Sequence, residues 1–203
     1  MRPSATNILA GVTFGAFVFA LLAGLPHLYL QAGFVPLRLH EPLPLPAVPF
    51  VLTPLTATLL HGGWLHLGFN LVMLVYCGRM VETVLGERRL LFLYVLGAYG
   101  AAAAQYLASP DSATPMVGAS GAISAIVAAY ALMYGRAVKS IGPVPGTVVR
   151  AGWLLAAWVA IQWLVGVATG TGEMQIATAA HVGGFVAGLV ATVPALRSRF
   201  ASA

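Results

Sequence analysis

The chain has 203 residues, of which 60% are hydrophobic and only 7% are charged. Soluble domains carry about 25% charged residues, so this composition excludes an ordinary soluble domain and is typical of a protein that lies in a lipid bilayer. The net charge of +5 comes from scattered basic residues, which argues against a nucleic-acid-binding surface. Cys77 is the only cysteine, so no disulfide can form within the chain.

Six apolar runs approach the length of about 20 residues that a membrane-spanning helix needs. All 13 prolines fall outside these runs, as expected for helices that satisfy their own backbone hydrogen bonds. No charged tail or low-complexity linker marks a second domain. The sequence therefore predicts an all-α membrane protein, a six-helix bundle that forms one domain over residues 1–203. The predicted spans are 8–25, 65–84, 90–108, 119–134, 151–167 and 176–193.

The first run follows Arg2, which raises the alternative of a cleaved signal peptide. The run is long for a signal peptide and lacks a clear small-x-small cleavage site, so we expect a retained first span. The stretch 26–60 is also apolar, but it holds seven prolines and cannot form a regular spanning helix. We predict that it is a long first loop at, or partly in, the membrane interface.

Polar residues stand near the start of three later runs. His66 and Asn70 are four residues apart in the second run, which places them on one helix face. Ser120 opens the fourth run between Gly118 and Gly121, and His181 lies near the start of the sixth. The fourth run is short, at roughly 24 Å against about 30 Å of hydrocarbon, so its first residues are expected to lie below the membrane surface.

The Lys and Arg residues predict the orientation of the bundle. With six spans, nine of the ten basic residues lie on or near the side that holds both termini, and only Arg38 lies on the other side. Both termini are therefore predicted to be cytoplasmic. The second, fourth and sixth spans then run from outside to inside, so their polar residues should meet at a similar depth near the outer face.

These residue types suit acyl transfer. A serine hydroxyl becomes a strong nucleophile when a histidine takes its proton, which makes Ser120 and His181 a candidate pair. The oxyanion needs hydrogen-bond donors, and the Ser120 backbone N–H, the Asn70 amide and the His66 ring are available. Gly118 and Gly121 leave room for a substrate backbone. No acidic residue lies near these positions in the outer half of a span, so the sequence predicts a dyad.

At these residues the chain resembles the rhomboid family of intramembrane serine proteases. The resemblance runs from about residue 8 to 196. It rests on three separated segments in the right order: HGGWLHLGFN from His61, VGASGAIS around Ser120 and AHVGGFVAG around His181.

The resemblance implies that Ser120 is the nucleophile, that His181 is the general base, and that His66 and Asn70 stabilise the oxyanion. It implies a mobile cap at 169–175 and a side gate for substrate at the fifth span. It also implies transmembrane protein substrates cut near the outer face, no metal or other cofactor, and a bacterial inner membrane.

Two departures from the family pattern stand out. Many members carry a Trp-Arg pair in the first loop, where this chain has Thr53-Pro54-Leu55-Thr56. Many also carry an aromatic residue four positions after the nucleophile, which packs against the catalytic histidine. This chain has Ser124 there, which leaves the support of His181 without a candidate.

Several of these residues also have a purely structural interpretation. Ser120 could be a small packing residue, and His66 with Asn70 could hydrogen-bond two helices together. His61 is interpreted as an anchor for its loop, and Gly184 with Gly188, four residues apart, as a tight helix contact that supports the site. The tryptophans of the fifth span are interpreted as lipid-facing or packing residues: Trp153, Trp158 and Trp163.

Two other functions remain open at this stage. A non-catalytic rhomboid-like protein that binds membrane clients would usually lack the serine or the histidine, and this chain has both. A haem carrier would need paired axial histidines, and His66 is the only histidine at a depth that matches His181. Zinc and aspartyl intramembrane proteases fit poorly, because the chain has no His-Glu-x-x-His motif and no aspartate within a span.

Overall fold

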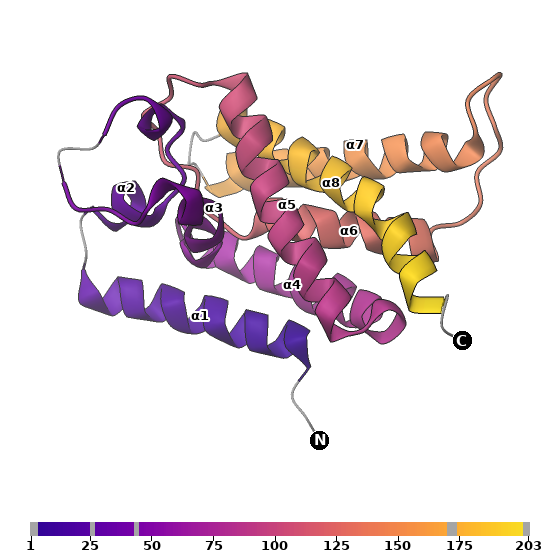
Figure 1. Cartoon of the computed structure of the whole chain (residues 1–203), viewed down its shortest axis with the longest axis horizontal. Coiled ribbons are helices and arrows are strands. Elements are labelled where there is room, and N and C mark those ends of the chain that lie inside the picture. Colours follow the sequence, from indigo (N-terminus) through magenta and orange to yellow (C-terminus); the bar gives the residue numbers. More distant parts are fainter. Residues whose placement is uncertain (1–3, 25–26, 43–44, 170–173, 201–203) are drawn as a thin grey trace.

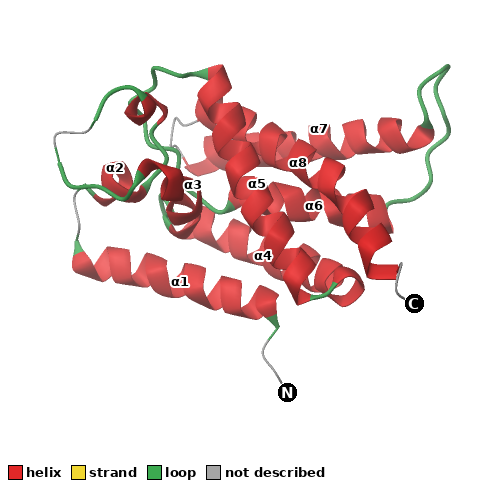
Figure 2. Cartoon of the chain, in the orientation of Figure 1, coloured by secondary structure: helices red, strands yellow, loops and turns green. Residues whose placement is uncertain are grey.

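The computed structural model describes residues 4–24, 27–42, 45–169 and 174–200. Within these ranges the chain is helical, and its only extended pairing consists of two isolated bridges (Figure 2). Short helical turns, including α2 (Leu28–Ala32) and α3 (Thr53–Thr56), fill the stretch between the first two long helices. The six main helices are α1 (Ala5–Ala23), α4 (Trp64–Leu85), α5 (Glu87–Ala108), α6 (Ser120–Tyr134), α7 (Gly146–Thr169) and α8 (Met174–Phe200).

The apolar helices confirm an all-α membrane protein. Four helices in the described part of the chain are long and apolar enough to cross a bilayer, namely α1, α4, α5 and most of α8. The helix α6 has only 15 residues, and the apolar stretch found in α7, Gly146–Ile161, is also shorter than a full span. The number of six spans, and the place of the first loop in the membrane interface, therefore stay predictions.

The last helix is longer than the sequence suggested. The predicted span ends at 193 because Pro194 follows, but α8 continues through Pro194 to Phe200. A proline removes one backbone donor without ending a helix when the neighbouring structure tolerates the loss. The added turns place Ser198 beside Arg89 at the start of α5, whose guanidinium donates to the Ser198 hydroxyl and carbonyl at 3.0 Å each.

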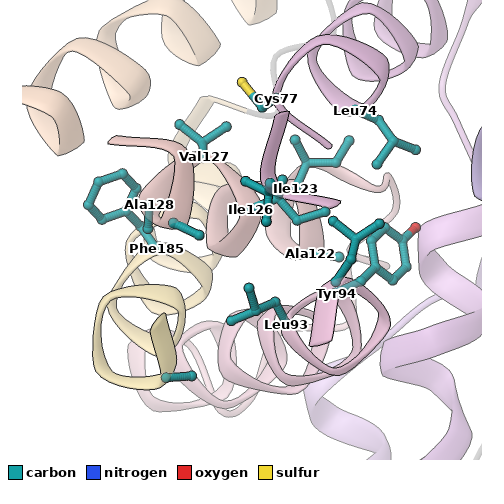
Figure 3. Packing of buried hydrophobic residues seen from close by; sticks show 14 of the residues in the cluster. Leu74, Cys77, Leu93, Tyr94, Ala122, Ile123, Ile126, Val127, Ala128 and Phe185 are labelled. Carbon is teal, nitrogen blue, oxygen red and sulfur yellow. The ribbon is translucent and has the colours of Figure 1, made fainter. Parts of the chain in front are cut away.

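The short helix α6 occupies the centre of the bundle. In Figure 1, α4, α6 and α8 run in one direction, and α1, α5 and α7 run in the opposite one. The buried face of α6 extends almost all round, with every residue from Ser120 to Ala129 buried. Figure 3 shows Ile123 and Ile126 of α6 among side chains from three neighbouring helices: Leu74 of α4, Leu93 of α5 and Phe185 of α8.

Small residues let the central helices approach with their backbones nearly in contact. A Cβ added at Gly184 of α8 would lie 2.0 Å from the Gly121 carbonyl oxygen of α6, and one at Gly188 would lie 2.4 Å from the Ala125 carbonyl oxygen. On the other side of α6, Gly97 of α5 makes a similar approach to Ala122. Since lipid gives helices no hydrophobic reason to associate, close packing of this kind supplies much of the attraction.

The helix α1 is attached at the opposite end of the bundle from Ser120. The Glu82 carboxylate of α4 accepts hydrogen bonds from the backbone N–H groups of Ala5 and Thr6, at 2.8 and 3.0 Å, and from the Thr6 hydroxyl. It thereby satisfies donors that the first turn of a helix leaves unpaired. Arg79, one turn earlier on α4, donates to the Asn7 side chain. Arg79 and Glu82, in the last turns of α4, thus both bond to α1 and not to each other.

The stretch after α1 packs against the segment that leads into α6. Phe34 and Met116 exchange backbone hydrogen bonds of 3.1 and 2.8 Å, and Leu37 N–H donates to the Ser112 carbonyl. Nearer the start of α6, Gly118 N–H donates to the Ala57 carbonyl at 2.9 Å. The first loop therefore fixes the backbone that delivers Ser120.

Gly188→Ala tests the backbone contact between α6 and α8. The added methyl group meets backbone atoms of Ala125, which cannot move aside as a side chain can, so we expect a loss of about 1–3 kcal/mol or more in the free energy of unfolding. Gly68→Ala on α4 is the matched control, because nothing lies within 4 Å of its Cβ position. Thermal unfolding in detergent should separate the two variants, and equal midpoints would contradict the contact.

Candidate active site

The start of α6 is held by two hydrogen bonds from the segment before α4. Besides the Gly118 bond to Ala57, the Ala119 N–H points at the His61 Nε2, 3.4 Å away. Gly118 has φ +115°, a conformation that favours glycine, and it turns the chain into the helix. Ser120 follows in the first turn of α6, with 8% of its surface exposed.

Ser120 and His181 lie within hydrogen-bonding distance. The His181 Nε2 of α8 is 2.8 Å from the Ser120 Oγ of α6, and both residues are buried. Three residues after His181, Gly184 rests on the Gly121 carbonyl, which brings the two helices close enough for this bond. A serine hydroxyl donating to a histidine nitrogen is the arrangement that a nucleophile and its general base need.

His66 of α4 lies on the other side of the same serine. Its Cε1 and Nε2 atoms are 2.7 Å from the place that a Cβ on Gly118 would occupy, and the Ser120 Oγ is 3.8 Å from that place. The Gly62 N–H points at the His66 Nδ1, 3.4 Å away. A neutral ring that accepts at Nδ1 carries its proton on Nε2, so the His66 ring presents a donor on the side of Ser120.

Asn70 is fully buried one turn beyond His66. Its Nδ2 donates to the His66 carbonyl oxygen at 2.8 Å, which leaves the second hydrogen of the amide for another acceptor. Its Oδ1 is buried with no hydrogen-bond partner among the described residues. A buried amide that leaves part of its hydrogen-bonding capacity unused is costly, and function is the usual reason to keep one in a membrane protein.

His61 joins the two parts of the site. Its ring lies edge-on to His66 with centroids 5.0 Å apart, its Nε2 faces the Ala119 N–H, and its carbonyl accepts from the Tyr29 hydroxyl at 2.9 Å. Burial, with a smaller contribution from the neighbouring His66, lowers the pKa of His61 to about 3. The neutral ring is the form that can accept from Ala119. The interpretation of His61 as a loop anchor agrees with these contacts.

An aromatic ring does lie beside His181, but it comes from α7. The indole of Trp158 is edge-on to the imidazole with centroids 6.4 Å apart, and its Nε1 donates to the Ser124 Oγ at 2.6 Å. Sequence reasoning treated Trp158 like Trp153 and Trp163, yet those two are 71% and 52% exposed and Trp158 is 3% exposed. The small residue at position 124, where the family pattern has an aromatic residue, was the sequence signal that an aromatic ring from another helix lies beside His181.

The structure thus brings together Ser120, His181, His66, Gly118, Gly121 and Gly184, with Asn70 adjacent on α4. The expected cap at 169–175 falls largely on residues 170–173, which lie outside the described residues. Among the described residues, no group of three or more His, Cys, Asp or Glu side chains could hold a metal ion.

Comparison with known proteins identifies a family and a similar human protein. Residues 51–198 match the family model described as the Rhomboid domain, which covers most of the chain and all of the site residues above. The chain is also similar to the human protein named Rhomboid-related protein 3, with 37% identity over 76 residues. That alignment covers 37% of this chain and 18% of the human protein's length.

The pKa of His61 predicts a pH dependence of stability. Between pH 6.5 and about 3 the unfolded chain protonates this histidine and the folded chain does not, so the folded state should lose stability as the pH falls through that window. His61→Gln removes this titration, and we expect its unfolding temperature to fall less steeply with acidification than that of the wild type. Parallel curves over pH 7 to 4 would contradict the assignment.

Proposed function

Because the chain belongs to the rhomboid family, a family of intramembrane serine proteases, we propose that it cleaves transmembrane proteins with Ser120 as nucleophile and His181 as general base. The observation that carries this proposal is the 2.8 Å separation of the Ser120 Oγ and the His181 Nε2 in a buried site. The finding that the chain is an integral membrane protein agrees with such substrates.

The reaction begins when the Ser120 Oγ attacks the scissile carbonyl carbon. The His181 Nε2 takes the hydroxyl proton as the C–O bond forms, which gives a tetrahedral intermediate and an imidazolium. The imidazolium then gives the proton to the leaving amine nitrogen as the C–N bond breaks, and an acyl-enzyme remains. Water attacks that ester, His181 again takes and returns a proton, and the second product leaves with Ser120 restored.

Three donors are available for the oxyanion of the tetrahedral intermediate. The Nε2–H of His66 and the free N–H of the Asn70 amide come from one face of α4, and the backbone N–H of Ser120 comes from the first turn of α6. The first backbone N–H groups of a helix have no partner within the helix and attract negative charge. Donors of this kind act most strongly where water is largely excluded.

The pair operates as a dyad in this proposal. The acidic residue of α4, Glu82, is engaged by the first turn of α1 and lies about 24 Å along the helix from His66. In this proposal packing and hydrogen bonds orient His181.

Cleavage near the outer face follows from the distribution of basic residues. Ser120, His66 and His181 all lie near the N-terminal ends of parallel helices, at the end of the bundle away from Arg79, Arg89 and Arg197 (Figure 1). By the positive-inside rule the end with the arginines is cytoplasmic, as are both termini, and the site is near the outer face. Within the family the six-span form fits a bacterial inner membrane.

Ser120→Ala tests the nucleophile. We expect complete loss of cleavage of a single-span substrate in vesicles and complete loss of fluorophosphonate labelling, with an unchanged unfolding temperature, because the variant removes one small hydroxyl. Ser198→Ala, at the other end of α8, is the matched control and should keep both. Labelling that persists in Ser120→Ala would exclude Ser120 as the nucleophile.

Asn70→Ala tests the oxyanion donor. Loss of one such donor lowers kcat by about 10²–10³-fold in other serine enzymes, and we expect a fall of this order with little change in KM. Asn7→Ala, which removes the partner of Arg79 at the far end of the bundle, should keep wild-type kcat. If kcat were unchanged in Asn70→Ala, the side chain would have only a packing role.

A further inference from the structure

The Ser124 hydroxyl forms hydrogen bonds with two neighbours. Its Oγ donates to the Ser120 carbonyl one turn back at 2.7 Å and accepts from the Trp158 Nε1–H at 2.6 Å. Both bonds are buried, and Ser124 itself has no exposed surface. An indole N–H surrounded by protein and lipid needs an acceptor, so this bond defines where the ring of Trp158 can lie.

The ring of Trp158 fills the space between three other helices. It is edge-on to His181 of α8, nearly parallel to Phe69 of α4 at a centroid distance of 6.0 Å, and bonded to Ser124 of α6. The imidazole of His181 therefore has the Ser120 hydroxyl at its Nε2 and the indole against its ring. A buried aromatic group in this place restricts how the imidazole can rotate.

The helix that carries Trp158 is otherwise weakly embedded. Of the α7 side chains that the structure describes, Trp158 alone is fully buried, and large apolar residues on both sides of it are exposed, including Trp153, Ile161 and Leu164. Near its start, α7 is tied to the end of α6 by Arg150, which donates to the Leu132 and Gly135 carbonyls. Trp158 is thus the main buried attachment of α7 beyond that anchor.

We propose that Trp158, held by its hydrogen bond to Ser124, positions the imidazole of His181, so that the base is aligned only while α7 is packed against α6. This inference rests on the proposed function of the Ser120–His181 pair. It gives Ser124 and Trp158 one joint role: the small residue on α6 leaves the space, and the large residue on α7 fills it and orients the histidine.

Two single substitutions remove the same bond from opposite sides. Trp158→Phe keeps a ring but removes the N–H, and Ser124→Ala removes the acceptor and leaves the ring in place. We expect each to lower kcat about tenfold with KM within twofold of the wild-type value, the pattern of a misaligned catalytic group. The double variant should be no slower than the slower single variant, because both changes break the same Trp158–Ser124 hydrogen bond. Trp153→Phe and Trp163→Phe are matched controls on exposed faces and should keep wild-type kcat.

Moving the ring gives a stricter test. Trp158→Ala removes the indole that lies against His181, and we expect at least a tenfold fall in kcat and in the rate of fluorophosphonate labelling. Adding Ser124→Phe returns an aromatic ring from α6 to the vacated space and should recover a large part of both. A Trp158→Ala protein that keeps its kcat, or one that the second substitution fails to restore although it is folded, would overturn the positioning role.

A measurement without catalysis separates this inference from the proposed function. The unfolding temperatures of wild type, Trp158→Phe, Ser124→Ala and the double variant form a cycle, and a direct bond predicts strongly non-additive effects. Additive effects would overturn the inference even in an active enzyme. Absence of any cleavage or labelling by the wild type, with a non-additive cycle, would count against the proposed function and leave the Trp158–Ser124 bond established.

Discussion

The contact between the backbones of α6 and α8 is the constraint on which the site depends. A serine on one helix and a histidine on another can form a hydrogen bond when the two helices approach closely. Gly184 and Gly188 give that approach by resting on carbonyl oxygens of Gly121 and Ala125. The 2.8 Å separation of the Ser120 Oγ and the His181 Nε2 therefore depends on the close packing at Gly184 and Gly188, three and seven residues further along α8.

Side chains from neighbouring helices bind the backbone at two of the helix ends. Glu82 accepts from the first turn of α1, and Arg150 donates to the last carbonyls of α6. Lipid offers no hydrogen bonds, so pairs of this kind fix where helices begin and end. Some buried polar atoms have no partner among the described residues, and the Asn70 Oδ1 is one of them. The free N–H of the same amide is a donor of the kind that the proposed reaction needs.

Much of the fold was predictable from the sequence because a bilayer limits the choice of structure. Long apolar runs without proline form helices, and the predicted ranges match the observed helices closely, for instance 65–84 against Trp64–Leu85. The end of α8 was missed because the apolar run ends at 193, before Pro194, whereas the helix continues to Phe200 and bonds to Arg89 of α5 through Ser198. The bonds of Arg79 and Glu82 to the first turn of α1 were not readable from local pattern.

The candidate site divides in the same way. Ser120, His181, His66 and Asn70 were recognised because their motifs are local, and the arrangement of helix directions placed them at one end. The role of Trp158 depends on its hydrogen bond to Ser124, which lies 34 residues earlier in the sequence. The residues next to Trp158 give no local pattern that predicts this bond. Only the unexpected Ser124 marked the position where a tertiary contact had to replace a local one.

The shortness of α6 has a consequence for the surrounding lipid. A 15-residue helix spans about 22 Å, which would force thinning of a bilayer that touched it. Eleven of its 15 residues are buried by protein, so lipid chains meet the longer helices around it and hardly meet α6. The hydrophobic mismatch is therefore enclosed within the protein. Changes in bilayer thickness should then bear on the tilt of the exposed helices α1 and α7, while the depth of Ser120 within the bundle stays constant.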